Sequence, residues 1–168
     1  MNTLNKQIAH PRITIDYLAH HPAVIPELTQ LLYTEWADLY LAAGLTQQDL
    51  RAALEQRSVT NQLPLTLVAM AEDGTLLGAG SIKLDEPGTK AGLSPWLGGI
   101  YIKESQRGLG LGAQIVTALE QKARELGVAA LYLSADTAEG FYLRLGWQTL
   151  ERVESFGVRD VVLMTKQL

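Results

Sequence analysis

Residues 96–113 read WLGGIYIKESQRGLGLGA and join a short apolar strand, a polar corner and a glycine-rich turn to a long amphipathic helix. We expect the strand over residues 97–102 and the helix immediately after the glycines. The first backbone N–H groups of a helix have no partners within it, and the helix dipole adds partial positive charge there. This order of elements therefore predicts an anion site.

The residues of the turn favour a pyrophosphate as the anion. Alternating glycines lack the Cβ atoms that would keep a phosphate away from the helix amides. Arg107 adds a cation that can bind a phosphate through two hydrogen bonds. We therefore predict a pyrophosphate site made of Arg107, Gly108, Leu109, Gly110, Leu111, Gly112 and Ala113.

Composition limits the classes of function. The chain has 168 residues, of which 47% are hydrophobic and 19% charged, so we expect residues 1–168 to form one globular domain. It lacks cysteine, and its histidines (His10, His20 and His21) lack the spacing of a metal site, so we expect no metal. The net charge of −4 argues against nucleic-acid binding. The sequence shows no signal peptide or membrane-spanning run, and we expect a cytoplasmic protein without membrane contact.

Hydrophobic periodicity predicts a mixed α/β domain in the order β-α-α-β-β-β-α-β-α-β-β. We expect strands at residues 12–18, 65–71, 75–84, 97–102, 128–133, 147–153 and 159–166. We expect helices at residues 22–40, 46–58, 111–126 and 137–145, with Thr46 and Asp136 as N-caps. Gly98 and Gly99 inside a strand predict a bulge or a close backbone approach.

Glu35 lies on the apolar side of the first predicted helix, on the arc that includes Leu28, Leu32 and Leu39. An unpaired carboxylate is costly to bury, so its position needs an explanation. The sequence leaves three explanations open: an ion pair at the edge of the core, a helix that ends before Glu35, or an acid that lines a cleft for a cationic substrate.

Two other interpretations of the glycine turn are a flexible loop and a dinucleotide site, since residues 108–113 satisfy G-x-G-x-x-A. A Walker A loop is excluded because no Lys-Ser or Lys-Thr pair follows the glycines. In the dinucleotide fold the turn follows the first strand of repeated βαβ units, whereas three strands precede this turn. That fold also needs an acid about 20 residues later, and the nearest, Asp136, is predicted to cap a helix.

A second motif decides between these interpretations of the glycine turn. Residues 107–112 match the pattern [Q/R]-x-x-G-x-[G/A], and residues 138–147, AEGFYLRLGW, match A-x-x-F-Y-x-x-x-G-[F/W]. With both motifs in this order, the sequence resembles the GNAT superfamily of acetyl-CoA-dependent N-acetyltransferases. The resemblance implies a single domain with a twisted, mixed, largely antiparallel sheet of about seven strands. About four helices would flank the sheet, and a splayed strand pair would hold the cofactor.

The resemblance also implies roles for residues. The coenzyme A pyrophosphate would lie on the amides of the glycine turn, and pantetheine would add beside the strand that contains Ile100, Tyr101 and Ile102. It would lie between this strand and residues 128–133. The acceptor amine would enter from the side of the first two helices. We assign Glu35, Trp36, Trp96 and Gly99 to acceptor binding. For Trp96, the alternative is a place in the core. Many relatives carry an Asn before the last helix that contacts the cofactor. Residues 134–137 here read SADT, so the residue that makes this contact is left open.

The reaction needs few groups. A deprotonated amine attacks the thioester directly to give a tetrahedral intermediate, whose oxyanion would accept a hydrogen bond from a backbone N–H near Ile100 or Tyr101. Tyr142 would protonate the departing thiolate and contact the cofactor, and Glu35 would attract the amine or take its proton through water. The alternative for Tyr142 is a core tyrosine.

The acceptor is a small-molecule or peptide amine that the sequence does not identify, and homodimer formation is left open. A protein of a different class would use the same glycine turn: a non-catalytic acyl-CoA-binding sensor or interaction module, which would not need Tyr142.

Overall fold

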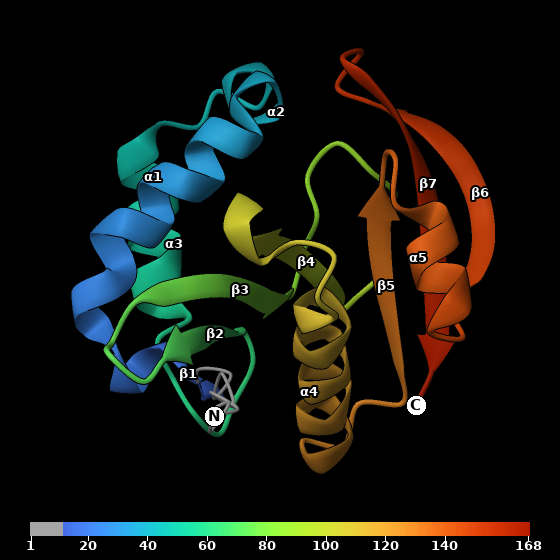
Figure 1. The fold of residues 1–168 in the computed structure, drawn as a ribbon. Coiled ribbons are helices and arrows are strands. Elements are labelled where there is room, and N and C mark those ends of the chain that lie inside the picture. The colour runs from blue at the N-terminus through green and yellow to red at the C-terminus, as the bar shows by residue number, and fades with distance from the viewer. Residues whose placement is uncertain (1–11) are drawn as a thin grey trace, which may run out of the picture.

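The computed structural model describes residues 12–168 of the chain (Figure 1). The first eleven residues, which include His10 and most of the stretch where a signal peptide would lie, fall outside this range. Within the described residues, no helix is both long enough and apolar enough to cross a membrane.

Seven strands of the described chain form one mixed sheet in the order β1-β2-β3-β4-β5-β7-β6. Neighbouring strands run antiparallel except β4 and β5, which run parallel. The strands are β1 (Ile13–Tyr17), β2 (Leu65–Ala71), β3 (Leu76–Lys83), β4 (Trp96–Ile102), β5 (Ala130–Ala135), β6 (Gln148–Ser155) and β7 (Arg159–Gln167). The predicted mixed, largely antiparallel sheet is thus confirmed.

Helices cover both faces of this sheet. The helices are α1 (Ile25–Glu35), α2 (Ala37–Ala42), α3 (Gln47–Gln56), α4 (Leu111–Glu125) and α5 (Glu139–Arg144). Successive side chains of β2 point to opposite faces, so Leu65 and Leu67 pack in the core under α4, whereas Val68 and Met70 pack in the core under α1 and α3. Burial on both faces explains why all residues of this strand except Thr66 are apolar.

The helix predicted over residues 22–40 is wrong in one respect: it is two helices. The chain breaks at Trp36, whose φ of −120° and ψ of 34° depart from helical values, and α2 follows in a new direction. The apolar spacing continues through the break, so periodicity alone gives no signal for it. Leu39, on the same predicted stripe, lines a cavity instead of the core.

The predicted N-cap at Thr46 is confirmed, but the one at Asp136 is wrong. Thr46 and Asp49 form a complete capping box at the start of α3. By contrast, α5 begins at Glu139 after Ala138, which makes no side-chain cap. The Asp136 carboxylate instead accepts hydrogen bonds from the Thr137 N–H at 2.7 Å and from Arg159 at 2.9 Å.

Glu120 connects α4 to the second half of the sheet. Its side chain is 5% exposed, yet both carboxylate oxygens are bonded. Oε1 accepts from the indole N–H of Trp147 at 2.9 Å, and Oε2 accepts from Lys166 Nζ at 2.7 Å. Lys166 also donates to the Leu145 carbonyl at 2.6 Å. This buried network fixes the end of α5 and the start of β6 against α4 and β7.

Glu120→Gln should destabilise the fold by about 2 kcal/mol, because it leaves the mostly buried Lys166 ammonium without a counter-ion. For a chain of this size we expect a Tm lower by about 4–8 °C. Glu125→Gln is the matched control, since this residue pairs with Lys122 on the exposed side of the same helix. Differential scanning calorimetry measures both variants, and equal Tm values would show that the network adds nothing to stability.

Candidate functional site

The sheet opens between β4 and β5. The two strands are paired only at Trp96 and Tyr132 within the described chain, at the start of β4 and the middle of β5. Because the strands are parallel, the gap widens toward their carboxyl ends, where the glycine turn follows β4 and α5 follows β5. The backbone groups on this edge of β4 have no strand partner, so an extended ligand can pair with them as an added strand would.

A bulge lies on the other side of the same strand. β3 pairs Ala79 with Tyr101 and Ser81 with Gly98, so that two residues of β4, Gly99 and Ile100, lie opposite one residue of β3. Gly99 has a φ of +60°, which glycine adopts without strain. The bulge predicted from the paired glycines is confirmed, and it changes the direction of β4 beside the gap.

The glycine turn leaves open space at the start of α4. Gly110 occupies the N-cap position with a φ of +84°, and a Cβ added there would meet no atom within 4 Å. The same holds for Gly108 at a φ of +75°. The first turn of α4, which the structure describes in full, carries no acidic side chain. Its free N–H groups and dipole therefore face a volume that a phosphate group would fit.

Arg107 lies between this turn and the rest of the site. Its Nε donates to the Ile102 carbonyl at 2.8 Å, and its guanidinium lies 5.8 Å from the centre of the Tyr101 ring. One terminal nitrogen is 3.9 Å from the Glu35 carboxylate. Both side chains of this pair are nearly half exposed, so the ion pair adds little to stability and leaves both groups accessible.

A cavity of about 580 Å³ adjoins the gap. β4 forms one wall through residues 97–100, residues 134–138 form another, and residues of α1, α2 and α3 complete the lining. Its charged lining residues are Glu35, Asp49, Arg57, Lys83, Asp85, Glu86, Asp136 and Arg159. Since both β4 and β5 contribute to the wall, the gap between these strands opens directly into the cavity.

Tyr142 on α5 lines this cavity while most of its ring is buried. The residue is 7% exposed, and its ring packs edge-on against Phe141 and Trp147. Burial raises the pKa of Tyr142 to about 12, so the hydroxyl stays protonated at neutral pH and can donate a proton or a hydrogen bond.

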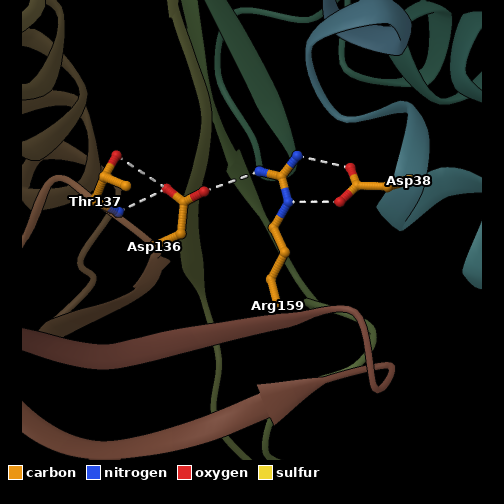
Figure 2. A network of polar contacts seen from close by, with 4 residues as sticks. All are labelled: Asp38, Asp136, Thr137 and Arg159. Atoms are coloured by element: carbon orange, nitrogen blue, oxygen red, sulfur yellow. Dashed lines mark hydrogen bonds and ion pairs between the residues drawn. The ribbon is translucent and has the colours of Figure 1, made fainter.

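Arg159 joins two sides of the cavity (Figure 2). From the start of β7 it donates two hydrogen bonds of 2.7 Å to Asp38 on α2, and a third of 2.9 Å to Asp136 at the end of β5. The hydrogen bonds from Arg159 hold the pKa of the Asp38 carboxyl below its usual value. Both oxygens of Asp136 are thus bonded outside α5, which begins three residues later at Glu139.

Comparison with known proteins identifies the family. The family model described as "Acetyltransferase (GNAT) family" matches residues 25–147, well over half of the chain. The chain belongs to the GNAT acetyltransferase family. The matched segment runs from the first residue of α1 to Trp147, so it contains β4, the glycine turn, α4 and α5.

Solved structures share the GNAT fold at low sequence identity. An aminoglycoside 6'-N-acetyltransferase complexed with coenzyme A aligns with a TM-score of 0.68 and 16% identity, over 92% of this chain and 96% of that one. A candidate acetyltransferase from Salmonella typhimurium, solved with acetyl-CoA, aligns at 0.66 and 18%, over 94% of both chains. A candidate acetyltransferase from Acinetobacter baylyi ADP1 aligns with a TM-score of 0.71 and 16% identity, over 96% of this chain and 95% of that one.

A curated relative is more similar in sequence over a shorter stretch. A candidate acetyltransferase of Bacillus subtilis (strain 168) is 45% identical over 71 residues, which are 40% of this chain and 47% of that protein. The aligned stretch thus spans about half the length of this relative.

The GNAT fold brings most of the predicted site residues together. Glu35, Trp36, Gly99, Ile100 and Tyr142 all line the cavity. Tyr101 and Ile102 continue β4 from the cavity toward the glycine turn. Glu35 lies at the end of α1 with its side chain 43% exposed, so it is not a buried core acid.

Trp96 is the exception among these residues. We assigned it to acceptor binding, but it is 1% exposed and does not line the cavity. Its indole N–H donates to the Leu93 carbonyl at 2.6 Å, and its ring packs with Val161 and Leu163. It is a core residue because it lies at the paired end of β4 and β5, where Val161 and Leu163 of β7 bury its ring.

Tyr40, Arg57 and Arg159 are among the cavity residues that the sequence analysis did not assign to the site. Each occupies a position that an ordinary surface or core residue would also fill, one in α2, one after α3 and one at the start of β7. Only the tertiary fold brings them to one cavity.

Proposed function

We propose that this GNAT protein transfers the acetyl group of acetyl-CoA to a primary amine by direct attack of the amine. One observation carries the proposal. The gap between β4 and β5 begins near an open helix N-terminus, the anion site, and ends in a cavity lined by Tyr142. A long thiol cofactor with a pyrophosphate at one end fits this order of features.

The residues present fit acetyl-CoA. The amides at the start of α4 and Arg107 would hold the pyrophosphate, and the unpaired edge of β4 would bond the pantetheine amides. The bound cosubstrate supplies a thioester as acetyl donor. A backbone N–H near Ile100 or Tyr101 would stabilise the oxyanion, Tyr142 would protonate the leaving sulfur, and Glu35 would attract the amine or accept its proton through water.

An amine as acceptor agrees with the aminoglycoside N-acetyltransferases among the proteins of similar fold. Acetyl transfer is tested by following thiol release from acetyl-CoA with and without a panel of amines that includes aminoglycosides, polyamines, amino acids and peptides. An enzyme releases thiol only when an acceptor is present, with one acetylated amine formed per thiol. A sensor or interaction module would bind acetyl-CoA tightly and release no thiol with any amine.

Glu35→Gln should raise the KM for the amine about fivefold, because a charge some 4 Å from a cationic group in a wet site contributes about 1 kcal/mol. The KM for acetyl-CoA and the Tm should change little, since the ion pair with Arg107 is long and exposed. Steady-state kinetics with each substrate varied gives the two constants.

Glu27→Gln is the matched control for Glu35, because it lies on the same helix, pairs with Lys103 and is absent from the cavity wall. If Glu35→Gln lowers the Tm while both KM values stay unchanged, Glu35 is only a structural partner of Arg107.

A further inference from the structure

Three cationic side chains line the cavity, and only two of them, Lys83 and Arg159, pair with a carboxylate of the described residues. Lys83 pairs with Glu86, and Arg159 binds Asp38 and Asp136. Arg57, just after the end of α3, is partly buried and lines the same cavity. Among the residues that the structure describes, no carboxylate oxygen lies within 4.0 Å of its guanidinium, and Glu86 and Asp85 act on it only as more distant charges.

This arrangement is costly for Arg57. Burial lowers the pKa of its guanidinium below the usual value, and the charges of Glu86 and Asp85 only partly oppose this effect. Glu86 is already bound to Lys83, and Asp85 is exposed to solvent. A guanidinium that lines a cavity without a paired carboxylate is arranged to receive an anion from outside the chain.

Tyr40 provides a second donor in the same cavity. Burial raises the pKa of its hydroxyl to about 12, with the charge of Arg57 acting in the opposite direction, so the hydroxyl stays neutral at neutral pH. Both side chains line the same cavity. Its ring is held by stacking on Tyr33 at a centroid distance of 5.3 Å. A neutral O–H beside a guanidinium suits a carboxylate, which accepts several hydrogen bonds.

We infer that Arg57 and Tyr40 bind a carboxylate of the acceptor, so that the acceptor is an amino acid or another amine that carries a carboxylate. The inference rests on the proposed function and names its substrate class. The amine end of the zwitterion is attracted by acids that line the same cavity, among them Glu35. The Tyr40 and Arg57 side chains thus bind the carboxylate, which lies at the end of the acceptor opposite the reacting nitrogen.

The test compares amino acids with their carboxamides, which keep the amine and the side chain but lack the carboxylate. At pH 8 the carboxamides have more free amine, so this difference works against the inference. For wild-type protein we expect kcat/KM to be at least about tenfold higher for the acids, since a hydrogen-bonded pair with a charged group contributes about 1.5–3 kcal/mol.

Arg57→Met should remove this preference: KM for the acids rises by at least about tenfold, and KM for the carboxamides and for acetyl-CoA stays within about twofold. Arg57→Lys should restore part of the preference, because it retains the charge without the planar fork. Arg51→Met is the matched control, as this arginine lies on the exposed side of α3 and pairs with Glu55. Circular dichroism verifies the fold of each variant.

Calorimetric binding of the same amino acids in the presence of coenzyme A separates the two proposals. Binding that Arg57→Met abolishes, without any acetyl transfer, would refute the proposed function and retain the carboxylate site. Acetylation of carboxamides and acids at equal rates, or an equal loss for both in Arg57→Met, would overturn the inference and retain the acetyltransferase. Absence of both binding and turnover for every amino acid would also overturn it.

Discussion

Gly110→Asp should weaken acetyl-CoA binding by about 100-fold or more while the fold survives. A Cβ at Gly110 points into open space, so the new carboxylate would stand where the pyrophosphate is expected. It would accept hydrogen bonds from the amides at the start of α4 and repel the phosphates, and two such losses of about 1.5 kcal/mol each already give this factor. Aspartate tolerates the left-handed backbone better than most residues and is a favoured N-cap, so the helix should remain intact.

Two control variants isolate the cause of this loss. Gly110→Asn adds a side chain of the same shape without charge, and it should weaken binding much less than Gly110→Asp. Gly127→Asp places the same side chain at the other end of α4, where φ is +78° and space is also open, and it should leave affinity unchanged. Calorimetry gives the dissociation constants, and thermal melting reports the fold.

Unchanged acetyl-CoA affinity in a folded Gly110→Asp protein would refute the pyrophosphate assignment. Tight binding of NADH to the wild-type protein, with none of acetyl-CoA, would instead support the dinucleotide interpretation of the same glycine turn.

Features that depend on neighbouring residues were predictable from the sequence. The strand, glycine turn and helix of residues 96–126 require particular backbone angles and an apolar stripe, and both appear locally in the sequence. The bulge at Gly99 is predictable for the same reason, since paired glycines in a strand have few other uses. The stripe from Leu111 through Ile115 and Leu119 packs against the sheet as its spacing predicts.

Features that depend on distant partners were not predictable. Asp38 and Arg159 are 121 positions apart, and no local pattern links them. Asp136 bonds to Arg159 and to the Thr137 N–H, and α5 begins only at Glu139, so the local cap rule did not hold at Asp136. Trp96 was assigned by its proximity to the site in sequence, but the side chain of a strand residue can point to either face. Tyr40 and Arg57 carry no motif at all.

Tyr142→Phe should lower kcat by at least about tenfold, because a positioned general acid contributes on the order of 10²–10⁴ and water can replace part of it. The change removes one oxygen and keeps the ring that packs on Phe141 and Trp147. Acetyl-CoA affinity should therefore stay within about threefold, since at most one neutral hydrogen bond is lost.

The raised pKa of Tyr142 increases the free-energy cost of proton transfer from its hydroxyl to the leaving thiolate. An ordinary tyrosine near 10 would transfer its proton to a thiolate of conjugate-acid pKa about 8.5 at a cost of about 2 kcal/mol. With the pKa raised to about 12, the cost becomes about 5 kcal/mol if the thiol pKa is unchanged. The same burial destabilises a thiolate and raises the thiol pKa, which brings the two values together again. The hydroxyl also remains protonated at the alkaline pH where an amine is free to react.

Tyr132→Phe is the control for Tyr142→Phe, because this tyrosine lies on β5 against Trp96 and does not line the cavity. Single-turnover measurements with saturating amine isolate the acetyl-transfer step from product release. If Tyr142 is the acid, Tyr142→Phe lowers the rate of this step. An unaltered single-turnover rate would remove Tyr142 from the chemistry, since ring packing is the one role that phenylalanine preserves in full.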